Sequence, residues 1–123
     1  MSLDYDGLQV AYLGVALAHY LDVETGDIID LPLDAEPPGD PDRFRRIPTR
    51  TAESEEEDRR LFVETLQGEF TPYRAPLAAA AENHNEFRQI LLADRRVERS
   101  FFNFKNDRAT RAIEEWAREQ GLS

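Results

Sequence analysis

The chain has 123 residues, no cysteine and a formal net charge of −10. This length suits one globular domain, residues 1–123, and the lack of cysteine excludes disulfides and thiolate metal sites. No apolar run approaches the ~20 residues of a membrane span, and the N-terminus lacks the basic-then-apolar layout of a signal peptide. We therefore expect a soluble, cytoplasmic protein.

The charge is unevenly distributed along the chain. Residues 1–42 contain ten carboxylates and neither Lys nor Arg. Such an acidic segment repels phosphate backbones and anionic membranes, which disfavours binding to nucleic acids and lipid surfaces.

A short helix is predicted first. Ser2 and Asp4 are both suitable N-caps for it. The face that would pack on a core carries four residues at helical spacing: Leu8, Ala11, Tyr12 and Val15.

The next segment predicts a β-hairpin. Residues 18–23 and 28–31 are β-rich and flank a turn in which Gly26 can adopt a positive φ. Leu21 lies on one side of the first strand, and Tyr20 and Asp22 lie on the other. We expect the first side to cover a core and the second to meet water.

Residues 33–42 hold three prolines, one glycine and four carboxylates, so we expect a solvated loop there. Residues 43–50 are expected to return as a third strand. Pro48 would place that strand at an edge of the sheet or end it.

The second half of the chain predicts helices. Ser54 and Glu57 fit a capping box for a helix that runs through Leu66. Pro76 suits the first position of a further helix, and Asn83 or Asn85 can cap the one after it.

The longest predicted helix spans residues 95–122. Its apolar stripe repeats at helical spacing and consists of Val97, Phe101, Phe102, Phe104, Ala109, Ala112, Ile113 and Trp116. Gly121 is a natural C′ residue. The predicted fold class is α+β: a small antiparallel sheet packed by four to five helices, with a long amphipathic C-terminal helix.

Five short motifs follow one another along most of the chain: Tyr20-Leu21-Asp22-x-Glu24-Thr25-Gly26-Asp27-Ile28, Ile47-Pro48, Phe87-Arg88, Phe102-x-Phe104-Lys105 and Glu115-Trp116-x-x-Glu119-x-Gly121-Leu122. Their order and rough spacing resemble the bacterial uncharacterised protein family (UPF) 0158. The chain departs from the family pattern at residues 87–91 and at Phe101-Phe102. Because this family has no assigned activity, the resemblance implies a fold and no mechanism.

The residue patterns indicate no catalytic motif, no cofactor and no metal site. The hairpin carries four acids: Asp22, Glu24, Asp27 and Asp30. They could hold a cation or be solvated, but their spacing does not fit a calcium loop. The two histidines, His19 and His84, have no second ligand at helical spacing. Arg88 and Lys105 stand beside apolar residues, where they could contact an anion or lay their stems over apolar surface.

The candidate binding residues are four arginines within eight positions: Arg43, Arg45, Arg46 and Arg50. They could bind a protein partner, an acidic peptide or a phosphate through bidentate pairing, or neutralise the acidic hairpin of the same domain. The missing motifs and the charge segregation favour a non-catalytic binding or regulatory module. The alternative is an enzyme whose site is assembled from scattered residues such as Asp22, Asp30 and Arg46.

Overall fold

The computed structural model describes residues 3–122, which divide into two compact units. The sheet unit consists of the described residues up to Arg50 together with those from Ala109 onward, and the helical unit is Thr51–Arg108. The predicted single domain stays a prediction, because a division by contacts does not measure folding cooperativity.

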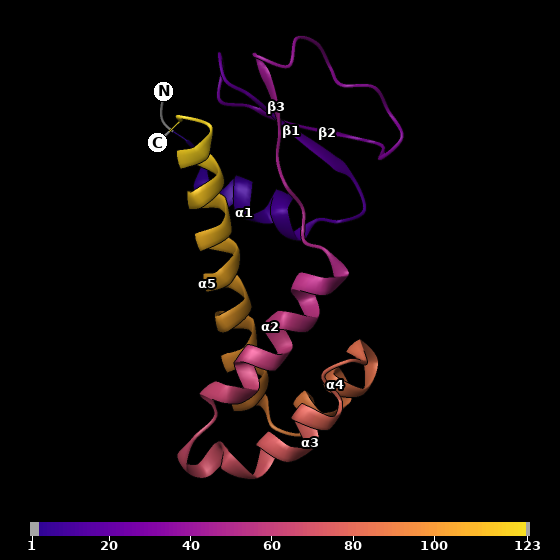
Figure 1. Cartoon of the computed structure of the whole chain (residues 1–123), viewed down its shortest axis with the longest axis vertical. Coiled ribbons are helices and arrows are strands. Elements are labelled where there is room, and N and C mark those ends of the chain that lie inside the picture. Colours follow the sequence, from indigo (N-terminus) through magenta and orange to yellow (C-terminus); the bar gives the residue numbers. More distant parts are fainter. Residues whose placement is uncertain (1–2, 123) are drawn as a thin grey trace. The chain divides into compact units, whose positions relative to one another are not determined.

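The sheet unit contains helix α1 (Tyr5–Leu13) and three strands, β1 (Ala18–Asp22), β2 (Ile28–Leu31) and β3 (Phe44–Arg46) (Figure 1). The antiparallel order is β2-β1-β3, which confirms the hairpin and the third strand at an edge. Asp4 caps α1 by accepting a hydrogen bond from the Gly7 amide at 3.0 Å. Ser2, the other predicted cap, lies outside the described residues.

Both sides of β1 are buried, so the expectation of one water-facing side is wrong. Tyr20 and Asp22 were expected to meet water, yet both are covered. Tyr20 pairs in register with Arg46, whose guanidinium carbon lies 5.5 Å from the ring centroid. Asp22 is covered by Arg43, 2.9 Å away. The cause is the central position of β1, because long side chains from the neighbouring segment reach over it.

The core of the sheet unit joins α1, the sheet and the last turns of helix α5 (Arg95–Glu119). Its buried members include Leu8, Leu21, Ile113 and Trp116. The predicted C′ glycine is confirmed: Gly121 has φ 71°, and the Leu122 amide donates to the Ala117 carbonyl at 2.9 Å. This bond and the one from Gly121 to Arg118 form a Schellman motif, which ends the helix.

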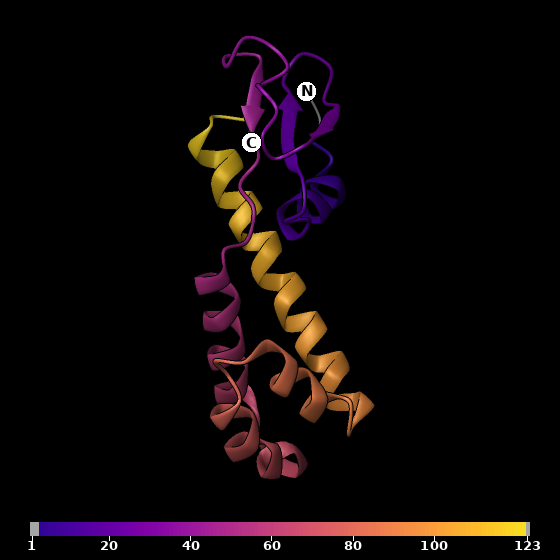
Figure 2. The ribbon, with the colours of Figure 1, turned by 90° about the vertical axis from the view of Figure 1, so that its right-hand side faces the viewer.

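The helical unit contains α2 (Ala52–Thr65), a 3₁₀ helix η1 (Gly68–Tyr73), α3 (Arg74–Ala79), α4 (His84–Leu91) and the first part of α5. Helix α5 is drawn as one unbroken helix in both views (Figures 1 and 2). Helix α2 begins earlier than predicted, because Thr51 rather than Ser54 is the N-cap. The Thr51 hydroxyl accepts a hydrogen bond from the Ser54 amide, and the Ser54 hydroxyl accepts one from the Thr51 amide, both at 3.0 Å. Asn83 caps α4, as predicted.

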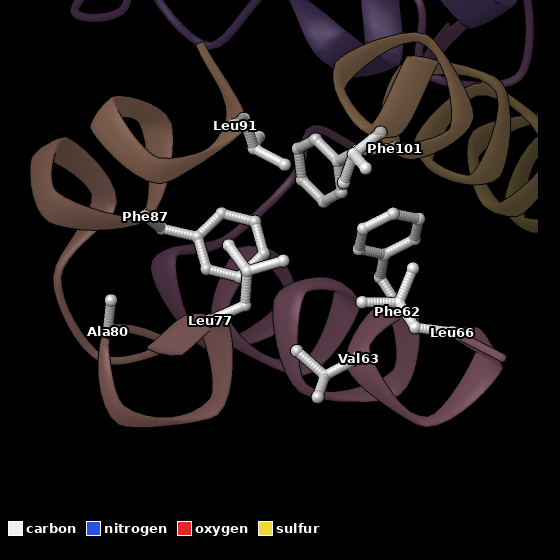
Figure 3. Close-up of a cluster of buried hydrophobic side chains, with 9 residues drawn as sticks. Phe62, Val63, Leu66, Leu77, Ala80, Phe87, Leu91 and Phe101 are labelled. Atoms are coloured by element: carbon white, nitrogen blue, oxygen red, sulfur yellow. The ribbon is translucent and has the colours of Figure 1, made fainter. Parts of the chain in front are cut away.

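The core of the helical unit is built around three phenylalanines (Figure 3). Phe101 lies between Phe62 and Phe87, with ring centroids 5.2 Å from each. The cluster is completed by six aliphatic residues: Val63, Leu66, Leu77, Ala80, Leu91 and Val97. The fold class, α+β with a long C-terminal helix, is confirmed. Within the described residues, no helix has both the length and the apolar character needed to cross a membrane.

Candidate functional site

A pocket of about 310 Å³ lies within the helical unit. We call it the Arg59 pocket. It is lined by one residue of α2 and by four residues each of α4 and α5: Arg59, then His84, Phe87, Arg88 and Leu91, then Glu98, Phe101, Phe102 and Lys105.

The spacing of these residues explains why α4 and α5 each line the pocket with four side chains. The α4 residues occupy positions 84, 87, 88 and 91, and the α5 residues occupy positions 98, 101, 102 and 105. Both sets follow the steps i, i+3, i+4 and i+7, which gather side chains onto one face of a helix. Each helix therefore contributes one continuous face to the pocket.

The apolar part of the pocket is continuous with the core. Phe87, Leu91 and Phe101 are buried and belong to the core cluster (Figure 3). Phe102 does not: 46% of it is exposed, so its assignment to the core stripe of the long helix is wrong. It follows Phe101 by one residue, and a step of about 100° turns it away from the core. Its ring centroid lies 6.3 Å from that of Phe101.

Arg59 is the most unusual residue of the pocket because it is charged and only 6% exposed. Its Nε donates a hydrogen bond to the Ala81 carbonyl at 2.6 Å. Among the described residues, no carboxylate lies within ion-pair distance of its guanidinium. A buried cation costs free energy unless an anion or hydrogen-bond acceptor compensates it. The adjacent Asp58 does not do so, because it pairs with Arg108.

Two further cations line the pocket. Arg88 is exposed, and no ion pair to it is found in the described part of the chain. Lys105 Nζ lies 4.8 Å from the centroid of the Phe102 ring. With Arg59, they face one carboxylate, Glu98, so the described residues that line the pocket carry a net charge of +2 with His84 neutral. This balance contrasts with the net charge of −10 for the chain.

The predicted arginine site lies in and around β3, away from this pocket in sequence. Arg43 donates to Asp22 from Nε at 3.0 Å and from Nη2 at 2.9 Å, and its Nη1 lies 3.2 Å from Glu24. The hydrogen bonds from the Arg43 side chain hold the pKa of Asp22 well below its usual range. The same contact raises the pKa of Arg43. Arg43 therefore neutralises hairpin acids, which is one of the two predicted roles.

The other three arginines have different surroundings. Arg45 donates to the Asp42 carbonyl at 3.0 Å and to Gln120 Oε1 at 2.9 Å. Arg46 is exposed and contacts Tyr20 across the strands. Arg50 is half-buried, and its amide donates to the Tyr12 carbonyl at 2.9 Å. Arg46 is thus the member most open to a partner, and the docking role of the four arginines stays a prediction.

The acids of the hairpin are engaged separately. Asp22 binds Arg43, whereas Asp30 lies 2.6 Å from Nδ1 of His19, whose Nε2 is 2.6 Å from the Gly14 carbonyl. No hydrogen bond or ion pair between described residues joins any two of Asp22, Asp30 and Arg46, the trio named for an enzyme site. Residues 3–122 also present no group of three or more His, Asp or Glu side chains placed to hold a metal ion.

No family model, curated protein or solved structure gives a significant match to this chain. The resemblance to UPF 0158 therefore stays a prediction.

Sequence reasoning identified two members of the pocket, Arg88 and Lys105, as possible anion contacts without placing them together. It missed Arg59. For the pocket residues of α4 and α5, the sequence does contain a signal, namely two faces with the same i, i+3, i+4, i+7 spacing. What the sequence lacks is any indication that these faces meet, because that depends on how α2, α4 and α5 pack.

Proposed function

We propose that this protein is a non-catalytic binding or regulatory module and that the Arg59 pocket is its ligand site. The proposed ligand is an organic anion with a flat apolar part. The observation that carries the proposal is the buried guanidinium of Arg59, which lines the pocket without a carboxylate partner among the described residues. A ligand anion would provide the charged partner that the described residues do not.

The size and lining of the pocket support a small ligand. Its volume of about 310 Å³ is at the lower end of the range of ligand sites, which combine apolar walls with a few placed polar groups. Phe87, Leu91 and Phe101 supply the apolar wall. Arg59 and Arg88 supply charged donors for an anionic group, and guanidinium groups bind such groups through two parallel hydrogen bonds.

An enzyme is the second candidate, because His84 and Glu98 line the same pocket. A histidine and a carboxylate are common general acids and bases. No hydrogen bond between them is found in the part of the chain that the structure describes. The net positive charge of the pocket lining favours binding of an anion over acid–base catalysis on it. Turnover of a bound ligand would decide for the enzyme.

A protein or acidic peptide partner is proposed separately for the β3 arginines. Arg46 supports it, since this residue is exposed on a strand at the edge of the sheet. Edge strands offer both side chains and unpaired backbone groups to an extended peptide.

The ligand proposal is tested with 1-naphthyl sulfate, a flat ring with one negative charge, and with the neutral 1-naphthol, both measured by isothermal titration calorimetry. We expect the sulfate to bind and 1-naphthol to bind at least about tenfold more weakly, because each tenfold corresponds to about 1.4 kcal/mol, the size of one charge-assisted hydrogen bond. The Arg88→Gln variant should lose a similar factor.

Arg111→Gln is the matched control, since Arg111 is also an exposed helical arginine but does not line the pocket. Its affinity for 1-naphthyl sulfate should equal that of the wild type. The proposal is wrong if no naphthyl anion binds at millimolar concentration, or if Arg88→Gln and Arg111→Gln weaken binding equally.

A further inference from the structure

We infer that the anionic group of the ligand is a phosphate monoester attached to a flat ring. This inference rests on the proposed function, because it specifies the ligand of the same pocket. It follows from the number of charges in the pocket, from the donors that two of its side chains present and from the position of one exposed aromatic ring.

The first argument is charge. Three cations and one carboxylate among the described lining residues leave a net charge of +2. A monocarboxylate or a sulfate ester carries a charge of −1, half the formal charge of this lining. A phosphate monoester has a second pKa of about 6, so it carries close to −2 at neutral pH and matches the pocket.

The second argument is the supply of donors. Arg59 Nε is occupied by the Ala81 carbonyl, which fixes the orientation of the planar group and leaves its two terminal nitrogens for the ligand. Arg88 has a full guanidinium fork, and Lys105 adds an ammonium group. A phosphate monoester has three terminal oxygens, each a strong acceptor, whereas a carboxylate has two.

The burial of Arg59 strengthens the first argument, which concerns charge. Its side chain is more than nine-tenths buried, so an ion pair with it is screened by water far less than an exposed pair. Electrostatic interactions strengthen as the local dielectric constant falls. The difference between a dianion and a monoanion should therefore be larger in this pocket than at an exposed arginine.

The third argument concerns the ring of the ligand. Phe102 is 46% exposed and lies beside Lys105 on the wall of the pocket. Exposed aromatic rings at a pocket provide stacking surfaces for flat ligands, which prefer offset or edge-to-face contact. Glu98 is one turn earlier on the same face of α5 and could accept a hydrogen bond from a hydroxyl or amino group on the ring. The ligand class is thus an aryl or heteroaryl phosphate monoester.

The test compares 1-naphthyl phosphate with 1-naphthyl sulfate at pH 7.5 by isothermal titration calorimetry. The two probes share the ring and the tetrahedral shape of the anionic group and differ by about one charge. We expect the phosphate to bind at least about tenfold more tightly than the sulfate. Inorganic phosphate should bind at least about tenfold more weakly than 1-naphthyl phosphate, because it lacks the ring.

Two variants tie the result to the pocket. Arg59→Lys keeps the charge and removes the paired donors, so it should weaken both naphthyl esters by a similar factor while leaving the preference for phosphate over sulfate unchanged. Phe102→Ala should weaken both naphthyl probes without changing the affinity for inorganic phosphate. Far-UV circular dichroism establishes that each variant is folded before titration.

The outcomes separate the two proposals. Equal affinities for phosphate and sulfate overturn this inference and leave the organic-anion site standing. Binding of inorganic phosphate as tight as that of 1-naphthyl phosphate assigns a plain phosphate site and also overturns it. If neither naphthyl anion binds, the proposed function fails as well.

Discussion

Replacing Phe62 by Ala is expected to lower the free energy of unfolding of the helical unit by about 4–5 kcal/mol. Phe62 is 1% exposed, and its ring contacts those of Phe101 and Phe104 at centroid distances of 5.2 and 5.7 Å. Truncating a buried phenylalanine costs about 3–5 kcal/mol, and the two aromatic pairs place this site at the upper end. That loss is large against the ~5–15 kcal/mol that stabilise a typical domain.

Phe102→Ala is the matched control. It makes the same chemical change in the same unit, at a ring that is 46% exposed. We expect a loss of less than about 1 kcal/mol, because surface substitutions are nearly neutral and the contact with Lys105 contributes about 0.5–1 kcal/mol. Equal losses in the two variants would show that the core assignment is wrong.

Urea unfolding followed with two probes also tests the predicted single domain. Trp116 is the only tryptophan and lies in the sheet unit, so its fluorescence reports on that unit, whereas far-UV circular dichroism reports on all helices. Because α5 runs unbroken through both units, we expect the two transitions to coincide in the wild type and in Phe62→Ala. A Trp116 transition that keeps its wild-type midpoint while the circular dichroism transition moves would refute this prediction.

Three further changes probe the sheet unit. Trp116→Ala should cost about 3–5 kcal/mol, and native emission that is red-shifted and fully quenchable would contradict burial of this side chain. Because the pKa of Asp22 is lowered in the folded state, its contact with Arg43 contributes stability that is complete above pH ~4 and is lost as the pH falls further, so Asp22→Asn should flatten the loss of melting temperature between pH 5 and pH 2. Reversing Arg45 and Arg46 to Glu should leave the melting temperature nearly unchanged while abolishing binding of an acidic peptide, since Arg46 is exposed, the half-buried Arg45 donates to neutral acceptors, and surface charges contribute ~0–1 kcal/mol each; strong destabilisation at low salt with peptide binding retained would assign them a structural role.

The elements that the sequence predicted well are those with local causes. Gly26 and Gly121 both have a positive φ, of 82° and 71°, and each lies where a turn or helix end was expected. The Asn83 cap and the edge position of β3 also follow from single residues with strong preferences. In each case the physical reason acts over a few neighbouring positions.

The errors arose where two local solutions compete or where packing decides. Thr51 and Ser54 are both good N-caps, and their reciprocal bonds start α2 three residues before the predicted position. Tyr20 was expected to be exposed and Phe102 to be buried, and both expectations are wrong because tertiary packing decides which face is covered. Period-two or helical spacing identifies faces, but it does not say which face a distant segment will cover.

The charge of the chain bears on which anions can reach the Arg59 pocket. A net charge of −10 repels any anion at long range, and the repulsion grows with the charge and length of the ligand. A nucleic acid would have to lay many phosphates along this surface, whereas a small ester presents only one. At physiological salt the Debye length of ~8 Å screens the repulsion before the ester reaches the pocket, where local cations dominate. We therefore expect this acidic chain with a small cationic pocket to favour compact anions over polyanions. Raising the salt concentration from very low values should speed the association of 1-naphthyl phosphate even as it weakens the bound complex.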